Sequence, residues 1–305
     1  MAAIYIAFSA ILTALNNLLI RRGMDNASPS IGDPFIALRF FTASLLSICL
    51  MYALHGSISL HPQMAFVGVV AGLALGLLQY AIGRSLQYGP ASMSFIFSSS
   101  ICVFPSIFMF FLFGEEFGRE YSLWDFIGSL LVLAGLYFMG KTQKNEDYVD
   151  FRKWVLWTSI AFAAGLLYCL ILEWRVLLQN KDLPDSIFLP FRIELPKSDL
   201  FIAIMFLVAA LSQIAVMPPL TSFSMNKPLA CGLIGGLLYV ISTFFLILGT
   251  EVAKTSSEKA LIFPLNTVLL IFLCNSWGRL LYHEKINWKA TFLCALGIII
   301  TAWHS

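Results

Sequence analysis

Charged residues are scarce in this chain. Only 12% of its 305 residues are Asp, Glu, Lys or Arg, against about 25% in a typical soluble domain, while 59% are hydrophobic. The formal net charge is +2, and the dispersed Lys and Arg form no basic stripe of the kind that marks a nucleic-acid-binding protein. The composition excludes an ordinary soluble domain and any nucleic-acid partner, and it predicts a membrane protein.

The chain also lacks the usual patterns of cofactor and metal sites. It has no Gly-rich phosphate loop, no CxxC pair and no Cys/His cluster, and its six cysteines all fall inside apolar stretches. We therefore expect no cofactor, no metal and no catalytic residues. An intramembrane enzyme is the weakest alternative, because the serine run Ser98–Ser100 has no buried base partner visible in the sequence.

Long apolar stretches fill what remains. Each has roughly twenty residues, enough to cross a hydrocarbon core about 30 Å thick, and none alternates as a barrel strand does. They cover residues 2–20, 34–54, 64–86, 92–113, 122–139, 154–172, 200–217, 229–250, 260–278 and 288–303. The sequence predicts an all-α integral membrane protein with ten transmembrane helices, the first of them a retained helix with no cleavage signal.

The second half of the chain repeats landmarks of the first at a shift of 164 residues. The paired residues are Gly68 with Gly232, Gly72 with Gly236, Ser92 with Ser256, Glu120 with Glu284 and Trp124 with Trp288. A repeat of five helices, an odd number, enters the membrane from the opposite face. We expect inverted five-helix repeats in residues 1–140 and 154–305, joined by a loop at 141–153, and such a pair favours alternating access.

Short motifs in the chain resemble those of a known family. The segment Leu86–Ser92, LQYGPAS, is similar to the "aLxYxxAS" signature of the EamA-like ten-helix exporters in the drug/metabolite transporter (DMT) superfamily. Further matching positions are Pro105, Gly114-Glu115-Glu116, Gly128, Gly135, Pro264 and His283-Glu284. The resemblance implies a metabolite transporter, not an enzyme, with a central cavity lined by helices of both halves. His283 and Thr255 depart from it, because glycine and alanine are usual there.

Polar side chains within the apolar stretches are the candidates for that cavity, since polar groups facing lipid cost free energy. Amides carry the most weight, because an unpaired amide is expensive to bury. The candidate substrate-binding residues are Asn16, Asn17, Gln79, Tyr80, Ser99, Tyr168, Tyr239, Thr243 and Asn266. The alternative is that the hydroxyl groups bond their own helix or a neighbouring one, and that the tyrosines anchor at the membrane interface.

Other features allow two interpretations each. Arg39 and Arg84 lie near the ends of apolar stretches, where they either snorkel to the headgroups or attract an anionic substrate. Pro105 and Pro264 are either hinges or fixed kinks. Glycines spaced by four residues, beginning at Gly68, allow close helix packing, with the surface of a homodimer as the second reading.

The preferred function is a secondary transporter that moves a small polar or amphipathic metabolite, such as an amino acid or a nucleoside-like compound. The alternative is a nucleotide-sugar or sugar-phosphate exchanger, which requires cations in the cavity, and Lys254, Lys259 and Arg279 are the rim candidates in the second half. Because the centres of the apolar stretches contain no carboxylate, facilitated diffusion or exchange is favoured over proton coupling.

We expect a multi-pass protein of the bacterial inner membrane whose partners are its substrate and the bilayer. An even number of helices places both termini on one side. The distribution of Lys and Arg favours termini outside the cell, whereas the family resemblance implies the cytoplasm, which we prefer.

Overall fold

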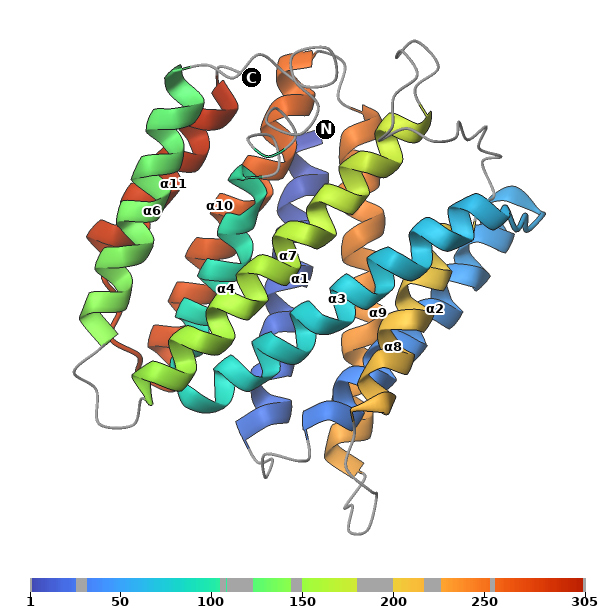
Figure 1. Cartoon of the computed structure of the whole chain (residues 1–305), viewed down its shortest axis with the longest axis horizontal. Helices are drawn as coiled ribbons and strands as arrows, with labels where there is room; N and C mark the ends of the chain where they lie inside the picture. The colour runs from blue at the N-terminus through green and yellow to red at the C-terminus, as the bar shows by residue number, and fades with distance from the viewer. Residues whose placement is uncertain are drawn as a thin grey trace.

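The computed structural model describes residues 2–25, 32–104, 108, 123–143, 150–179, 200–216, 226–252 and 256–303. These residues form ten α-helices and one short 3-10 helix (Figure 1), which confirms the all-α fold class. The elements are α1 (Ala2–Asp25), α2 (Gly32–His55), α3 (Pro62–Tyr88), α4 (Ala91–Ser99), η1 (Ser100–Val103), α6 (Leu123–Gln143), α7 (Phe151–Gln179), α8 (Phe201–Ala215), α9 (Asn226–Val252), α10 (Ser256–Tyr282) and α11 (Trp288–Trp303).

Each predicted apolar stretch corresponds to one of these α-helices. The fourth differs in detail, because α4 ends at Ser99 and the chain continues as the 3-10 helix η1. Beyond Phe104, only Phe108 of the predicted fourth stretch is described, so Pro105 lies outside the described residues. Pro264 lies inside α10, as expected from the sequence.

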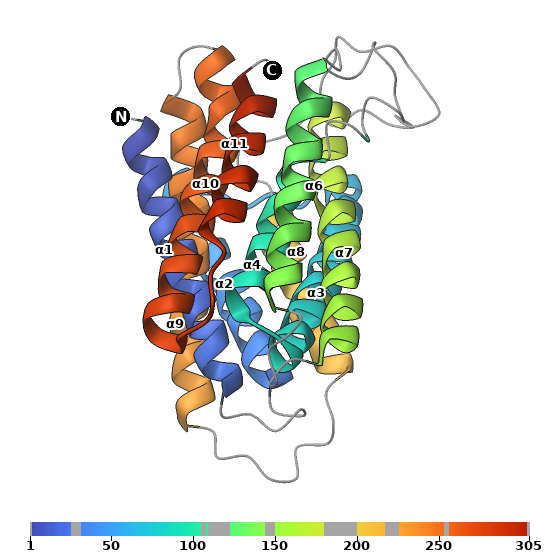
Figure 2. The ribbon, with the colours of Figure 1, turned by 90° about the vertical axis from the view of Figure 1, so that its left-hand side faces the viewer.

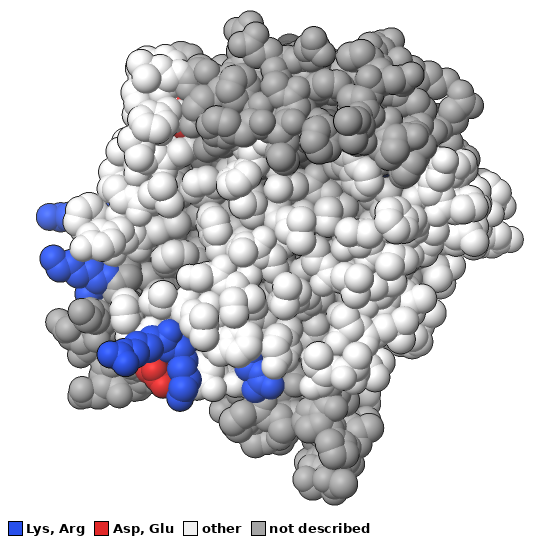
Figure 3. All heavy atoms as spheres, viewed as in Figure 1, with Lys and Arg blue, Asp and Glu red and all other residues white. Residues whose placement is uncertain are grey.

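The outer surface has the composition of a lipid-facing surface. Helices α1, α2, α3, α7 and α9 are long and apolar enough to cross a membrane, and α6, α8 and α11 are shorter apolar helices. Large apolar side chains such as Phe8, Leu73 and Phe292 are exposed along the bundle. In Figure 3 the described middle of one face carries almost no charge, and Lys and Arg gather toward one end. Lipid tails account for this exposed apolar surface, which water would not tolerate.

Helix contacts in one half of the bundle repeat in the other. The pair α3 and α7 has its counterpart in α9 and α1, and the pair α3 and α8 has its counterpart in α9 and α2. Three helices also contact their own counterparts, in the pairs α2–α8, α4–α10 and α6–α11, the last of which forms one edge of the bundle (Figures 1 and 2). Since each helix is five helices from its counterpart along the chain, the two run in opposite directions.

Glycines set the register of this pseudo-twofold packing. A Cβ atom added to Gly72 would lie 2.6 Å from the carbonyl oxygen of Met205, and one added to Gly236 would lie 2.6 Å from that of Arg39. Such distances leave no room for a side chain, so these glycines let α3 approach α8 and α9 approach α2. Their neighbours Gly68 and Gly232 follow the same pattern. This face packs within the chain, as the first reading of the glycine spacing predicts.

The equivalent contacts identify equivalent residues on α2 and α8. Gly72 meets Met205 and Val208, whereas Gly236 meets Arg39 and Thr42. Positions on α2 and α8 therefore correspond at an offset of 166 residues, since 205 − 39 and 208 − 42 both equal 166. Arg39 in the first half thus has Met205 as its counterpart in the second.

The LQYGPAS segment joins α3 and α4 to other parts of the bundle. The carbonyl oxygen of Leu86 accepts a hydrogen bond from Arg21 Nη1 of α1 at 2.7 Å. Gly89 packs against the Trp154 ring of α7, where an added Cβ atom would lie 2.3 Å from Cδ1. Trp154 is buried and donates its indole N–H to Ser94 Oγ at 3.1 Å. The motif therefore has a structural role, which requires glycine at position 89.

A carboxylate from the second half holds the N-terminus of α4. Glu284, in the turn between α10 and α11, accepts a hydrogen bond from the backbone N–H of Ala91 at 2.9 Å. An anion is favoured there by the unpaired N–H groups of the first helical turn. His283, next to it, has φ of 52°. Glycine adopts this backbone conformation at least cost, which accounts for the glycine that is usual at this position, and His283 adopts it although it carries a side chain.

Candidate functional site

Arg39 is the central feature of the candidate site. It lies on α2 seven residues after Gly32, about 10 Å along the helix axis, and its side chain is 0% exposed. The snorkelling interpretation of Arg39 is therefore wrong, because the side chain turns into the bundle. Arg84 of α3 is half-buried, with Gln87 Oε1 3.4 Å from its Nη1 and the Tyr80 ring 5.0 Å from its Cζ.

The Arg39 guanidinium has aromatic neighbours and no hydrogen-bond acceptor. Its Cζ lies 4.7 Å from the centre of the Phe40 ring and 5.2 Å from that of Tyr239 on α9. Nε, Nη1 and Nη2 are all buried without a hydrogen-bond partner. Cation–π contacts contribute about 0.5–2 kcal/mol each, whereas burying an unpaired ion costs several kcal/mol. The rings offset only part of this cost, so the position is complementary to an anion.

Asn16 of α1 provides a second unpaired polar group beside Arg39. Its side chain is 2% exposed, and Oδ1 has no hydrogen-bond partner. A Cβ atom added to Gly235 of α9 would lie 3.2 Å from this oxygen and 3.3 Å from Arg39 Cδ, so both side chains border the same glycine. Gly235 thus lets the Asn16 and Arg39 side chains pack closely against α9.

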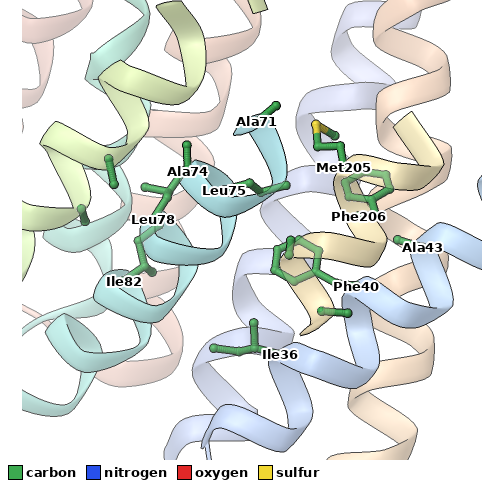
Figure 4. Packing of buried hydrophobic residues seen from close by; sticks show 14 of the residues in the cluster. Ile36, Phe40, Ala43, Ala71, Ala74, Leu75, Leu78, Ile82, Met205 and Phe206 are labelled. Atoms are coloured by element: carbon green, nitrogen blue, oxygen red, sulfur yellow. The ribbon is translucent and has the colours of Figure 1, made fainter. Parts of the chain in front are cut away.

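Aromatic rings continue from Arg39 across the pseudo-twofold axis. Phe40 of α2 stacks on its counterpart Phe206 of α8, with ring centres 6.1 Å apart, as Figure 4 shows between the two helices. Tyr239 contacts both rings, at 6.2 Å from Phe40 and 5.3 Å from Phe206. Because Phe40 and Phe206 occupy equivalent positions, their contact marks the place where the two halves meet.

The second half completes the site with apolar groups. Met205, the counterpart of Arg39, is buried, and its Sδ accepts a weak hydrogen bond from the Tyr168 hydroxyl of α7 at 3.6 Å. One side of the site is therefore cationic and polar, and the other is apolar. We refer to the whole set as the central cluster, which consists of Asn16, Arg39, Phe40, Tyr168, Met205, Phe206 and Tyr239.

Three of the sequence candidates, Asn16, Tyr168 and Tyr239, lie in this central cluster. Two others have different surroundings. Asn17 donates to Cys274 Sγ at 3.7 Å and lines a cavity of about 20 Å³ between α1, α4 and α10. Thr243 donates to the carbonyl oxygen of Tyr239, four residues earlier in α9, at 2.8 Å, which is the backbone bonding given above as the alternative.

The remaining candidates are dispersed over α3, α4 and α10. Gln79 is half-buried on α3 next to Tyr80, whose ring packs edge-on against Trp157 of α7 at 5.6 Å. Ser99 is the last residue of α4. Asn266 of α10 is half-buried, and its Oδ1 has no hydrogen-bond partner. None of these four has a contact with Arg39 among those described.

A second hollow lies at the turn between α10 and α11, with a volume of about 430 Å³. It is lined by Arg279, His283, Glu284, Lys285 and Ile286. Arg279 lies in this hollow, away from the central cluster, so its role as a rim cation stays a prediction. Lys254 and the side chain of Lys259 lie outside the described residues.

Sequence reasoning missed Arg39 and the paired phenylalanines as parts of one site. The sequence did contain a signal for Arg39, because its charge is isolated along the chain. Arg84 is the only other charged residue between Arg39 and Glu115. Within the described residues, no group of three His, Cys, Asp or Glu side chains could hold a metal ion.

Comparisons with known proteins agree with this architecture. A solved structure titled only "Crystal structure of protein" covers 99% of this chain and 97% of its own, with a TM-score of 0.58 and 15% sequence identity, and so supports the fold alone. No curated protein matches. The model of the EamA-like transporter family matches residues 1–141, the part that contains LQYGPAS, Asn16 and Arg39. Residues 1–141, just under half of the chain, therefore match the EamA-like transporter family, whose members are multi-pass membrane transporters of the DMT superfamily.

Proposed function

We propose that this transporter is a secondary carrier that moves a small polar or amphipathic metabolite by alternating access. The observation that carries the proposal is the position of the central cluster, where Phe40 of one half stacks on Phe206 of the other. A substrate held there contacts both halves at once. Rocking of the halves about such a contact exposes the substrate first to one side of the membrane and then to the other.

The repeated helix contacts support this mechanism. Because α3 meets α7 and α8 as α9 meets α1 and α2, either half can take up the packing of the other. The two conformations then have similar contacts and similar free energies, which a reversible carrier requires.

A nucleotide-sugar or sugar-phosphate exchanger of the same fold is the second candidate, and buried Arg39 is the observation in its favour. A single guanidinium, however, matches a single negative charge. A phosphate monoester carries about −1.5 to −2 at neutral pH, and a nucleotide sugar has two linked phosphates. Arg39 and Glu284 are the only buried charged side chains among the described residues, so the second cation that this candidate needs is not found there.

An intramembrane enzyme receives no support from the serine run. Ser100 Oγ is buried and has no hydrogen-bond partner, so no base is in position to activate it.

Reconstitution into liposomes tests the carrier proposal. Purified protein would be offered labelled amino acids, aliphatic and aromatic monocarboxylates, nucleosides and sugar phosphates, and we expect saturable uptake of one class that unlabelled compound of that class inhibits. Hydrolysis of a compound without uptake of any would contradict the proposal.

We also propose that the protein lies in the plasma membrane with both termini in the cytoplasm. The start of α1 and the end of α11 lie at the same end of the bundle (Figures 1 and 2). Cysteines introduced at positions 2 and 305 of intact cells should resist a membrane-impermeant thiol reagent until the membrane is opened. Labelling of both in intact cells would reverse the orientation.

A further inference from the structure

We propose that Arg39 binds the carboxylate of a small organic monoanion whose apolar body lies against Phe206 and Met205. The inference rests on the proposed carrier function and deepens it by naming the substrate class. Its starting point is a buried guanidinium with three nitrogen atoms that have no acceptor among the residues that the structure describes.

The geometry of the group favours a carboxylate. A guanidinium presents parallel N–H groups that match the two oxygens of a carboxylate, and this pairing is stronger and more specific than a bond to a neutral carbonyl. The ring centres of Phe40 and Tyr239 lie 4.7 and 5.2 Å from Cζ, and neither ring supplies a hydrogen-bond acceptor to the three guanidinium nitrogen atoms. The charge of one carboxylate neutralises the one buried cation.

The pseudo-twofold relation indicates the shape of the rest of the ligand. Where the first half presents Arg39, the second half presents Met205, and the Phe40–Phe206 stack lies between them. Methionine adapts to irregular apolar groups, and the aromatic faces pack against flat ones. A ligand that spans the axis therefore carries its charge at one end and a compact apolar or aromatic group at the other.

Asn16 completes the polar end. Its Oδ1 is a buried acceptor without a donor, and it borders the same glycine as the Arg39 side chain. This oxygen can accept an N–H or O–H group attached near the carboxylate. Hydroxy and amino derivatives of such carboxylates consequently belong to the same substrate class.

Binding of matched probes tests the inference on the full-length protein in detergent. The probes are 3-phenylpropanoate, its neutral amide 3-phenylpropanamide and phenyl phosphate. Their binding is measured by the shift in thermal unfolding temperature and by microcalorimetry. We expect the carboxylate to bind at least tenfold more tightly than the amide and the phosphate. Equal binding of acid and amide would overturn the inference.

Variants of Arg39 test whether this residue causes the preference for a carboxylate. Arg39→Gln should reduce the affinity for the carboxylate at least tenfold, to the level of the amide. The control is Arg84→Gln, at the half-buried arginine of α3, which should leave the affinity for the carboxylate unchanged. Arg39→Met, which replaces a buried charge by an apolar group of similar length, is the second variant if the glutamine variant does not fold. Unchanged carboxylate binding in a folded Arg39 variant would refute the assignment.

The outcomes separate this inference from the carrier proposal. If the wild-type protein carries a neutral compound in liposomes independently of Arg39, the carrier function holds and the carboxylate assignment fails. If it binds the carboxylate through Arg39 but moves none of the tested compounds, the binding assignment holds and the carrier proposal fails.

Discussion

Asn16 and Arg39 show how much the surroundings of a residue decide its role. Both are buried and both have polar atoms without partners among the described residues, and both pack against Gly235, where a side chain would crowd them. A carboxylate at position 16 would supply from within the protein the anion that Arg39 otherwise takes from a ligand.

Replacing Asn16 by Asp tests this relation. The change alters one atom, and the new carboxylate can pair with Arg39, so we expect a higher unfolding temperature and a loss of carboxylate binding of at least tenfold. Breaking a buried pair typically costs about 3–5 kcal/mol, so a gain of about 1 kcal/mol or more on forming one is a reasonable expectation. Thermal unfolding with and without 3-phenylpropanoate measures both effects.

The matched control is Asn17→Asp, next in the chain, whose side chain faces Cys274 instead. Among the described residues that line this small cavity, Arg21 is the only cation near a new carboxylate at position 17. Arg21 already donates a hydrogen bond to the carbonyl oxygen of Leu86. Carboxylate binding should persist in this variant. Equal loss of binding in both variants would show that any added charge in α1 disturbs the site.

At this scale the sequence predicts which residue types matter better than it predicts where they point. Asn16, Tyr168 and Tyr239 were identifiable because polar groups deep in an apolar helix need a reason to be there. For Arg39 the sequence left two interpretations open, because a position near the edge of an apolar stretch does not reveal the direction of the side chain. Thr243 resembled the others in sequence but bonds its own helix.

Among the elements, α3 and α9 pack closely on the partner helices α8 and α2. The glycines that make it possible occur at equivalent positions in the two halves, so the same substitution should have the same effect in each. Their spacing was visible in the sequence. The identity of the partner helices was not, because small residues allow close approach without specifying what approaches.

Gly72→Val and Gly236→Val should each destabilise the protein by at least about 1–3 kcal/mol, the usual cost of overpacking, since even a Cβ atom would lie 2.6 Å from a carbonyl oxygen. Leu73→Val and Leu237→Val are the matched controls, because these neighbours are exposed on the bundle surface, at 54% and 44%. Unfolding temperatures of the four variants measure the difference. A strong effect at one glycine and none at the other would contradict the equivalence of the two halves.

Helix content followed almost directly from hydropathy, since a chain in lipid must satisfy its own backbone hydrogen bonds. The change from α4 to the 3-10 helix η1 at Ser100 was not predicted. Hydropathy does not distinguish two helical forms that bury the same side chains. The choice between an α-helix and a 3-10 helix depends on local backbone hydrogen bonding instead.

For the whole molecule, the buried charge has a consequence for transport kinetics. When the two halves close around Arg39 without an anion, the cation remains unpaired at a cost of several kcal/mol, and each 1.36 kcal/mol slows a step about tenfold. We therefore expect exchange of substrate across the membrane to be at least about tenfold faster than net uptake.

Liposomes loaded with unlabelled substrate, compared with empty ones, measure this ratio from the initial uptake of labelled substrate. Liposomes without protein correct for passive diffusion of the acid. Equal rates into loaded and empty liposomes would show that the empty carrier returns freely and that Arg39 does not restrain it.

The internal repeat was the part of the global fold that the sequence predicted best, because Gly68 and Gly72 recur in order as Gly232 and Gly236. The functional difference between the halves was not visible in this way. It depends on α2 and α8, whose offset of 166 residues differs from the 164 of α3 and α9, so a single shift does not align Arg39 with Met205.

The pairing of Arg39 with Met205 has a practical consequence for engineering selectivity. In the proposed binding mode, Arg39 of one half holds the acidic end of the substrate, and Met205 of the other half contacts its apolar end. Libraries randomised only around Met205 can therefore alter the size of cargo accepted while the anchoring of its acidic end is left intact.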